Sequence, residues 1–284
     1  MSKNTSHRKI GRVVIELSAG TPNAIALHEA MAMAHALDSE IEGLYITNQE
    51  LEHVTRLTAA RSLSATGRKV AHDAARTLKR EILLASRSMQ RQFDELAEAA
   101  KLRHRFRTIA GQPIEEMCRA CADEEKASLL VLSETLALGH INEIDELLTQ
   151  PSNLGGLLMV GPGARERSGP AVIVPENMAG VEAMLDLAQA LIAKDKPIII
   201  FLAGDDDQAL RKDADQLHAT LKPDERLNIL SAKIPGHQPQ VMAEAIMRLK
   251  GGLVIAQYGG ALLPAKNSIF PLATALACPL LITR

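Results

Sequence analysis

Short runs of Val, Ile and Leu alternate along the whole chain with longer stretches in which apolar residues recur at helical spacing. Buried parallel strands and their connecting helices produce this alternation, so the chain is predicted to fold as an α/β protein. The expected strands are 12–17, 41–47, 106–109, 129–132, 156–160, 171–174, 198–202, 227–233, 253–256 and 279–283. The expected helices are one that ends near Leu37 and the segments 66–101, 113–125, 179–194, 205–221 and 240–250.

The order of elements begins again halfway along the chain. A strand, a glycine, a proline that opens a helix and a further strand occur at 109–132 and again at 234–256. In both copies the glycine ends a strand and the proline suits the first turn of a helix. The segment 161–170 is rich in Gly, Pro and charged residues, which is typical of a linker. We therefore expect two tandem five-stranded parallel sheets with helices on both faces, in domains 1–162 and 169–284, rather than one ten-stranded sheet.

Composition argues against several functional classes. Lys and Arg number 32 against 34 Asp and Glu, a balance that gives no reason to expect nucleic acid as a partner. Aromatic residues make up 2% of the chain, too few for the stacking platforms of single-strand binders. The most apolar stretch, 197–203, is too short to cross a bilayer, and residues 1–9 are polar. We therefore expect a protein that does not insert into membranes. Because three cysteines give no disulfide framework, we expect it to be cytoplasmic.

The predicted helix 66–101 is long, and the second half has no counterpart of equal length. One of its faces is apolar, and the opposite side carries five basic residues. We favour the interpretation that this basic side is a solvated face that keeps an Ala-rich helix in solution. The alternative is a docking strip for an acidic partner or a phosphate. The apolar face consists of Ala71, Ala74, Leu78, Ile82, Ala85, Met89, Phe93, Leu96 and Ala100, and the basic side of Lys69, Arg76, Arg80, Arg87 and Arg91.

Three segments, taken in order, resemble a known family. The first strand is followed by 20–23 (Gly-Thr-Pro-Asn) and an Ala-rich helix, the segment 111–117 precedes the strand 129–132, and the chain closes on Cys278, Pro279 and an aliphatic strand. This order, present almost from end to end, resembles the universal stress protein (UspA-like) family in its tandem form. The resemblance implies an adenine nucleotide alpha hydrolase-like fold, two domains paired within the chain as a pseudo-dimer, a homodimer, and a role in stress physiology.

Some members of that family bind ATP. The resemblance implies an Asp at the end of the first strand and, after the fourth strand, Gly-x-x-Gly followed by a spacer and Gly-Ser/Thr. Such glycines let backbone N–H groups approach phosphates. In the first half Glu16 and Ser18 stand where the Asp is expected, and the segment 133–140 has one glycine. Four nearby carboxylates would repel phosphate, so we expect no nucleotide there. They are Glu134, Glu143, Asp145 and Glu146.

The second half keeps part of this motif. Its spacing is shorter than in the family, an Asn replaces the second glycine, and its first strand ends in 175–177, Pro-Glu-Asn. It is not a P-loop, because no glycine precedes the lysine and no Ser follows it directly. We expect no resident cofactor, with ATP or AMP as weak ligands at most. The candidate nucleotide-binding residues are Gly259, Gly260, Lys266, Asn267 and Ser268.

The cysteines, two of the histidines and an acidic run are best interpreted as having structural roles. Cys118 and Cys121 lie more than a turn inside the predicted helix 113–125, where we expect them to fill core rather than hold zinc or exchange electrons. His28 and His35 share a helix face without the other ligands of a metal site. The run 205–207 is expected to cap the helix that follows. We recognise no catalytic motif and no metal motif in the sequence.

These patterns lead to one expected function and two alternatives. We expect a non-enzymatic stress-response or regulatory protein in which the ATP-binding motif has degenerated in both halves. The first alternative is a nucleotide-binding enzyme of the same α/β group, such as a nucleotidyl transferase or hydrolase. The second is an accessory regulatory subunit that docks on a transporter through the basic helix.

Overall fold

The computed structural model describes residues 10–17, 24–47, 62–63, 69–70, 74–122, 127–133, 148, 153–161, 164, 169–234, 238–260, 262–263, 272 and 275–283. In the first half the elements are β1 (Ile10–Glu16), α1 (Ala24–Ala36), β2 (Glu40–Thr47), β3 (Ser62–Leu63), β4 (Lys69–Val70), α3 (Ala74–Ala99), β5 (His104–Ala110), α4 (Pro113–Ala122), β6 (Ala127–Ser133) and β7 (Leu154–Val160). In the second half they are β8 (Ala171–Val174), η1 (Met178–Gly180), α7 (Val181–Leu191), β9 (Ile198–Gly204), α8 (Asp207–Thr220), β10 (Leu227–Lys233), α9 (Pro239–Arg248), β11 (Leu253–Gln257) and β12 (Leu280–Thr283).

The ten strands predicted from the sequence are all present, and they lie in the order β10-β9-β8-β11-β12-β7-β6-β1-β2-β5. Strands β1, β2, β5, β6 and β7 are the first unit, and strands β8 to β12 are the second unit. In each unit the third strand along the chain lies outermost, followed by the second, first, fourth and fifth. Neighbours within a unit are parallel. The two units therefore repeat one topology, as the sequence repeat predicts.

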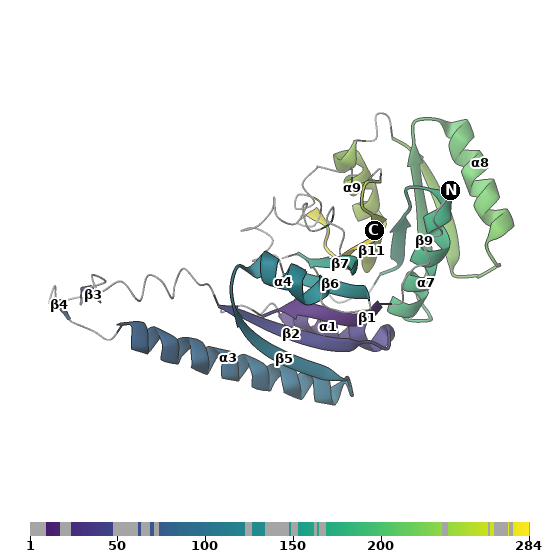
Figure 1. The fold of residues 1–284 in the computed structure, drawn as a ribbon. Helices are drawn as coiled ribbons and strands as arrows, with labels where there is room; N and C mark the ends of the chain where they lie inside the picture. The colour runs from purple at the N-terminus through teal and green to yellow at the C-terminus, as the bar shows by residue number, and fades with distance from the viewer. Residues whose placement is uncertain are drawn as a thin grey trace.

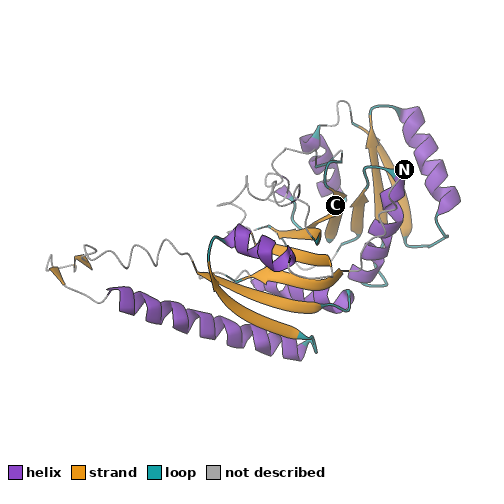
Figure 2. Ribbon diagram, in the orientation of Figure 1, coloured by secondary structure: helices purple, strands orange, loops and turns teal. Residues whose placement is uncertain are grey.

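The two units do not form separate sheets, and the expectation of two sheets is wrong on this point. Strand β7 pairs antiparallel with β12, so that Leu158 lies opposite Leu281. Both strands are apolar and buried along nearly their whole length. Each would otherwise be an unpaired edge, and pairing the two edges satisfies their backbone N–H and C=O groups. The result is one ten-stranded sheet with helices on both faces (Figures 1 and 2).

Each face of the sheet carries its own hydrophobic core. One core contains apolar residues of α4 and α9, and the other contains residues of α1, α3, α7 and α8. Helices α1 and α7 contact each other across the junction between the units. Because the same helices cover the same face in both units, the units are related by an approximate two-fold rotation. An aliphatic core on both faces agrees with the continuous apolar strands of a parallel sheet.

The long helix begins later than the sequence predicts. Lys69 and Val70 form β4, which pairs antiparallel with Ser62 and Leu63, so Lys69 is not on the helix. Gly67, between the two short strands in the sequence, disfavours helix. Helix α3 has 26 residues, and its predicted apolar face is correct only in part. Among the residues of α3 whose burial is described, Ser86, Met89, Phe93 and Ala97 are buried, whereas Ala85 and Leu96 of the predicted face are exposed.

Candidate functional site

The carboxyl ends of parallel strands, where the strand order reverses, are the usual ligand site of an open α/β sheet. In the first unit this place lies at the ends of β1 and β6, and in the second unit at the ends of β8 and β11. Because β7 and β12 run antiparallel, the carboxyl ends of the two units point toward opposite sides of the molecule. The chain therefore has two candidate sites that are far apart and independent.

A tight turn follows β11 in the second unit. The Gly260 N–H donates to the carbonyl oxygen of Gln257 at 3.2 Å, which closes the turn Gln257–Gly260. Gly259 has φ +87°, a conformation that side chains of L-residues rarely adopt, as a type II turn requires at this position. The Gly259 N–H donates to the carbonyl oxygen of Leu263 at 2.8 Å. Both glycine N–H groups are thus engaged by acceptors of the chain itself.

The space beside Gly260 is also occupied by the chain. A Cβ atom added to Gly260 would lie 3.2 Å from the Cβ of Glu176 and 3.1 Å from the carbonyl oxygen of Gln257. Glu176 follows β8 at the carboxyl end of the strand, and its side chain is exposed. A glycine here allows close approach of a neighbouring segment, and that segment is the chain's own Glu176 rather than an open cradle. A carboxylate at this place also disfavours an anion.

The start of α7 lies beside the same turn. The Gly180 N–H donates to Asn177 Oδ1 at 3.2 Å, so one of the donors at the helix N-terminus is already bonded. Gln257 Oε1 lies 3.1 Å from where a Cβ of Gly180 would be, so the turn lies directly beside the helix start. The connection between β8 and α7 and the turn after β11 therefore lie against each other at this end of the sheet.

The structure does not test the remaining candidates from the sequence. Lys266, Asn267 and Ser268 lie outside the described residues, as do Glu134, Glu143, Asp145 and Glu146 of the first half. Of the five proposed nucleotide contacts the structure thus places only Gly259 and Gly260.

At the carboxyl end of the first unit, Glu16 ends β1 and is buried. Tyr45 on the neighbouring strand β2 is also buried, and its hydroxyl has no hydrogen-bond partner among the described residues. Burial raises the pKa of Tyr45, and the nearby charge of Glu16 adds to the increase. Glu16 thus stands at the strand end where the ATP-binding pattern implied by the resemblance in the sequence has an Asp, and its side chain is buried.

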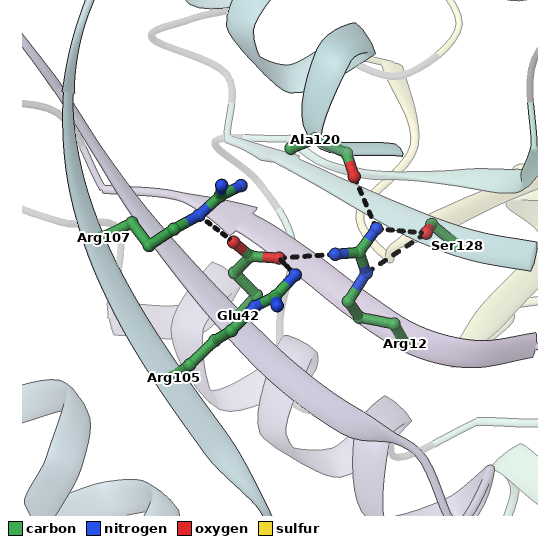
Figure 3. A network of polar contacts seen from close by, with 6 residues as sticks. All are labelled: Arg12, Glu42, Arg105, Arg107, Ala120 and Ser128. Atoms are coloured by element: carbon green, nitrogen blue, oxygen red, sulfur yellow. Dashed lines mark hydrogen bonds and ion pairs between the residues drawn. The ribbon is translucent and has the colours of Figure 1, made fainter. Parts of the chain in front are cut away.

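A polar network that the sequence analysis did not anticipate lies inside the first unit (Figure 3). Glu42 on β2 is fully buried, and three arginines from neighbouring strands converge on its carboxylate. Nη1 of Arg12 lies 2.8 Å from Oε2, Nη2 of Arg105 lies 2.6 Å from the same oxygen, and Nε of Arg107 lies 2.5 Å from Oε1. The side chains of Arg105 and Arg107 are about two-fifths exposed, whereas that of Arg12 is buried.

Arg12 extends the network to the helix layer. Its Nη2 donates to the carbonyl oxygen of Ala120 on α4, and both Nε and Nη2 lie within hydrogen-bond distance of Ser128 Oγ on β6. One guanidinium therefore ties together β1, β2, β6 and α4. A buried ion pair is tolerated only when its other donors are also satisfied, and Nε and Nη2 of Arg12 have these acceptors.

The second unit shows that the fold does not require this network. Aligning the units on Leu130 and Val254, in the middle of their fourth strands, places Ile199 at the position of Glu42. Asn228 then stands where Arg105 stands. Glu42 also lies near the amino end of β2, opposite the end where ligands bind in such sheets. We therefore assign the network to holding strand register in the first unit. Two charged residues inside otherwise apolar strands, Arg12 and Glu42, were the signal in the sequence.

No profile of a known protein family and no curated protein matches this sequence. Solved structures do match the fold. A universal stress protein from Archaeoglobus fulgidus has a TM-score of 0.60 at 13% identity, over 95% of this chain and 96% of that chain. A functionally unknown protein from Pseudomonas aeruginosa has a TM-score of 0.52 at 14% identity, over 96% of this chain and 92% of that chain. This chain has the fold of the universal stress proteins.

The universal stress protein fold extends over both units, since the matches cover almost the whole length of each chain. The fold implied by the resemblance in the sequence is confirmed. The turn Gln257–Gly260 follows β11, which is where the resemblance in the sequence leads us to expect the motif of the second half.

The cysteines of this universal stress protein fold lie in its interior, and all three are among the described residues. Cys121 and Cys278 are buried in one core, Cys118 packs against the same core, and none of the three forms a disulfide. Burial raises the pKa of the Cys121 thiol and of the Cys278 thiol to about 12. The core-filling interpretation of Cys118 and Cys121 is thereby confirmed. Within the residues that the structure describes, no group of His, Cys, Asp and Glu has the arrangement of a metal site.

Two further sequence expectations can be compared with the fold. Asp206 caps α8, because its Oδ1 accepts from the Gln208 N–H at 3.0 Å, as the run 205–207 predicts. Among the described helices none has the length and apolar character needed to span a bilayer.

Proposed function

We propose that this chain is a non-enzymatic regulatory protein of the universal stress type whose nucleotide site has degenerated in both units. One observation carries the proposal. The N–H groups of Gly259 and Gly260, at the place of the phosphate-binding glycines, donate to Leu263 and Gln257 of the chain itself.

The physical argument is one of competition. Phosphate binding by a glycine-rich turn requires N–H groups that point at the ligand without an intramolecular acceptor. To bind phosphate, Gly259 and Gly260 would each have to give up a hydrogen bond worth about 1 kcal/mol. The ligand would also approach Glu176, whose Cβ would lie 3.2 Å from a Cβ at Gly260. In the first unit the segment 133–140 has a single glycine, fewer than the motif requires.

Calorimetric titration with ATP, ADP and AMP tests the proposal, with native mass spectrometry of the purified protein as a check for retained nucleotide. We expect no saturable heat at millimolar nucleotide, and no change in the melting temperature. Gly260→Ala, which obstructs approach to the turn, should give the same null result as the unmodified protein. ATP binding at micromolar concentration that Gly260→Ala abolishes would overturn the proposal.

Two units with the same topology in one chain also support the proposed pseudo-dimer. Pairing of β7 with β12 joins them through main-chain hydrogen bonds, and α1 packs on α7 beside that junction. We propose that this intramolecular pair is the functional unit and that it associates further as a homodimer. Analytical ultracentrifugation tests the second part, because a monomer at all concentrations would contradict it.

A further inference from the structure

Helix α3 covers the outer part of the sheet in the first unit (Figure 1). Its inner side packs on β5 and β2, where Phe93 meets the ring of Phe106 with centroids 5.8 Å apart. Ser86 Oγ lies 2.8 Å from Thr108 Oγ1, and Asp94 Oδ1 lies 3.5 Å from Nε2 of His104. These contacts fix which side of the helix faces away from the protein.

The outward side of α3 combines leucines with arginines. Leu83 is 49% exposed and Leu84 is 55% exposed, which makes them the most exposed large apolar side chains among the described residues. Arg80, Arg87 and Arg91 are exposed around them, and none of the three forms an ion pair with another residue that the structure describes. Residues 80, 84, 87 and 91 follow helical spacing, with 83 beside them, so the five form one strip. We call these five residues the outer strip of α3.

The corresponding helix of the second unit lacks such a strip. Helix α8 has 14 residues against 26 in α3, and both of its leucines, Leu210 and Leu217, are buried. The first unit therefore carries a longer helix with two exposed leucines. The second unit has the same topology without the extra length and without exposed leucines on this helix, so the fold requires neither feature. Single exposed apolar residues are common, but an adjacent pair inside a basic rim is typical of a binding surface.

We propose that the outer strip of α3 is a docking surface for an acidic amphipathic helix of a partner protein. The two leucines would contact the apolar face of that helix, while the three arginines pair with carboxylates on its flanks. The strip from Arg80 to Arg91 is about 16 Å long, which matches about three turns of a helix laid alongside. This inference does not depend on whether nucleotide binds.

The charges argue against the other occupants. A second copy that placed its own leucines on this pair would bring Arg80, Arg87 and Arg91 against like charges. A bilayer of anionic lipids would attract the arginines, but Glu95 and Glu98 are exposed farther along the same helix and would be repelled. A partner protein can match a surface that is basic in one part and acidic in the next.

The test uses the full chain and two synthetic helical peptides of about 20 residues with identical leucines, one flanked by Glu and the other by Lys. We expect the Glu-flanked peptide alone to bind, with an affinity that falls as salt is added. The double variant Arg87→Glu, Arg91→Glu should weaken that binding about tenfold or more and gain binding of the Lys-flanked peptide. Leu84→Gln should weaken binding without reversing the charge preference.

Matched controls make each outcome decisive. Arg211→Glu with Lys212→Glu reverses two exposed charges on α8 and should leave peptide binding unchanged. The melting temperature of each variant shows that the fold is retained, which is expected because the substituted side chains are exposed. The proposal is overturned if the Glu-flanked peptide binds no tighter than the Lys-flanked one, or if the α3 and α8 variants behave alike. Leu84-dependent binding to anionic vesicles, or Leu84-dependent self-association, would also overturn it by assigning a different occupant.

Discussion

Glu42 Oε2 and Arg12 Nη1 lie 2.8 Å apart in the interior of the first unit, and both side chains are excluded from solvent. The Arg12 guanidinium also donates hydrogen bonds to the carbonyl oxygen of Ala120 and to Ser128 Oγ, so these contacts are all within the protein interior. The second unit has Ile199 at the place of Glu42, which shows that an aliphatic side chain can occupy this position in the same topology.

Glu42→Gln should destabilise the protein strongly, because it leaves the Arg12 guanidinium buried without its counter-charge. We expect the free energy of unfolding to fall by about 3–5 kcal/mol, measured by urea denaturation. Lys233→Ala, which removes an exposed ion pair with Asp207, is the control and should cost less than about 1 kcal/mol. The double variant Arg12→Met, Glu42→Leu should be less destabilised than Glu42→Gln. Equal losses for Glu42→Gln and Lys233→Ala would show that the network contributes nothing.

The junction of β7 and β12 should hold the two units together without the linker. A protease site placed within 163–168 allows the chain to be cut there, and the two pieces should still elute together. Leu281→Asp places a carboxylate in the pairing strand opposite Leu158, and the cut protein should then separate into its halves. Separation of the cut protein without that substitution would contradict the assigned role of the junction.

The strand pattern of this chain was readable from sequence because each strand is a continuous apolar run bounded by Gly, Pro or polar residues. The repeat of the order of elements predicted that the two units share one topology. The pairing of β7 with β12 was not readable, because two apolar edge strands distant in sequence carry no signal for the direction in which they pair. Lys69 shows the same limit: its helical pattern was overridden by pairing with Leu63.

The candidate site was predictable only in part, for related reasons. Gly259 and Gly260 stand out in the sequence, but the acceptors of their N–H groups and the position of Glu176 depend on tertiary packing. The network of Glu42 joins residues from strands far apart along the chain. Leu84 on α3 is not part of the predicted apolar face, and only the structure shows that it faces solvent.

The buried thiols predict a loss of stability in alkali. The pKa of Cys121 is about 12 in the folded protein, against an ordinary value of 9.0, because burial disfavours the thiolate. Below pH 9 the thiol is neutral in both states and the stability is fully present. As pH rises from 9 toward 12 the unfolded chain loses the proton while the folded protein keeps it, so the free energy of unfolding falls.

Urea denaturation across pH 8 to about 11 measures this slope. Cys278 has the same raised pKa and adds in the same direction. The double variant Cys121→Ala, Cys278→Ala should be less stable at pH 8 because it leaves cavities, and its stability should fall less steeply as pH rises. A slope unchanged by the double substitution would contradict the assignment to these thiols.

The most direct measurement of the central claim is the NMR signal of the Gly259 and Gly260 amides in the presence of ATP. If both N–H groups are held by Leu263 and Gln257, their resonances should stay in place at millimolar ATP and their exchange with solvent should remain slow. Gln208, whose N–H is bonded to Asp206 on the far helix α8, serves as the reference amide. Saturable shifts of Gly259 and Gly260, with Gln208 unchanged, would show that the turn opens to accept phosphate and would contradict the account.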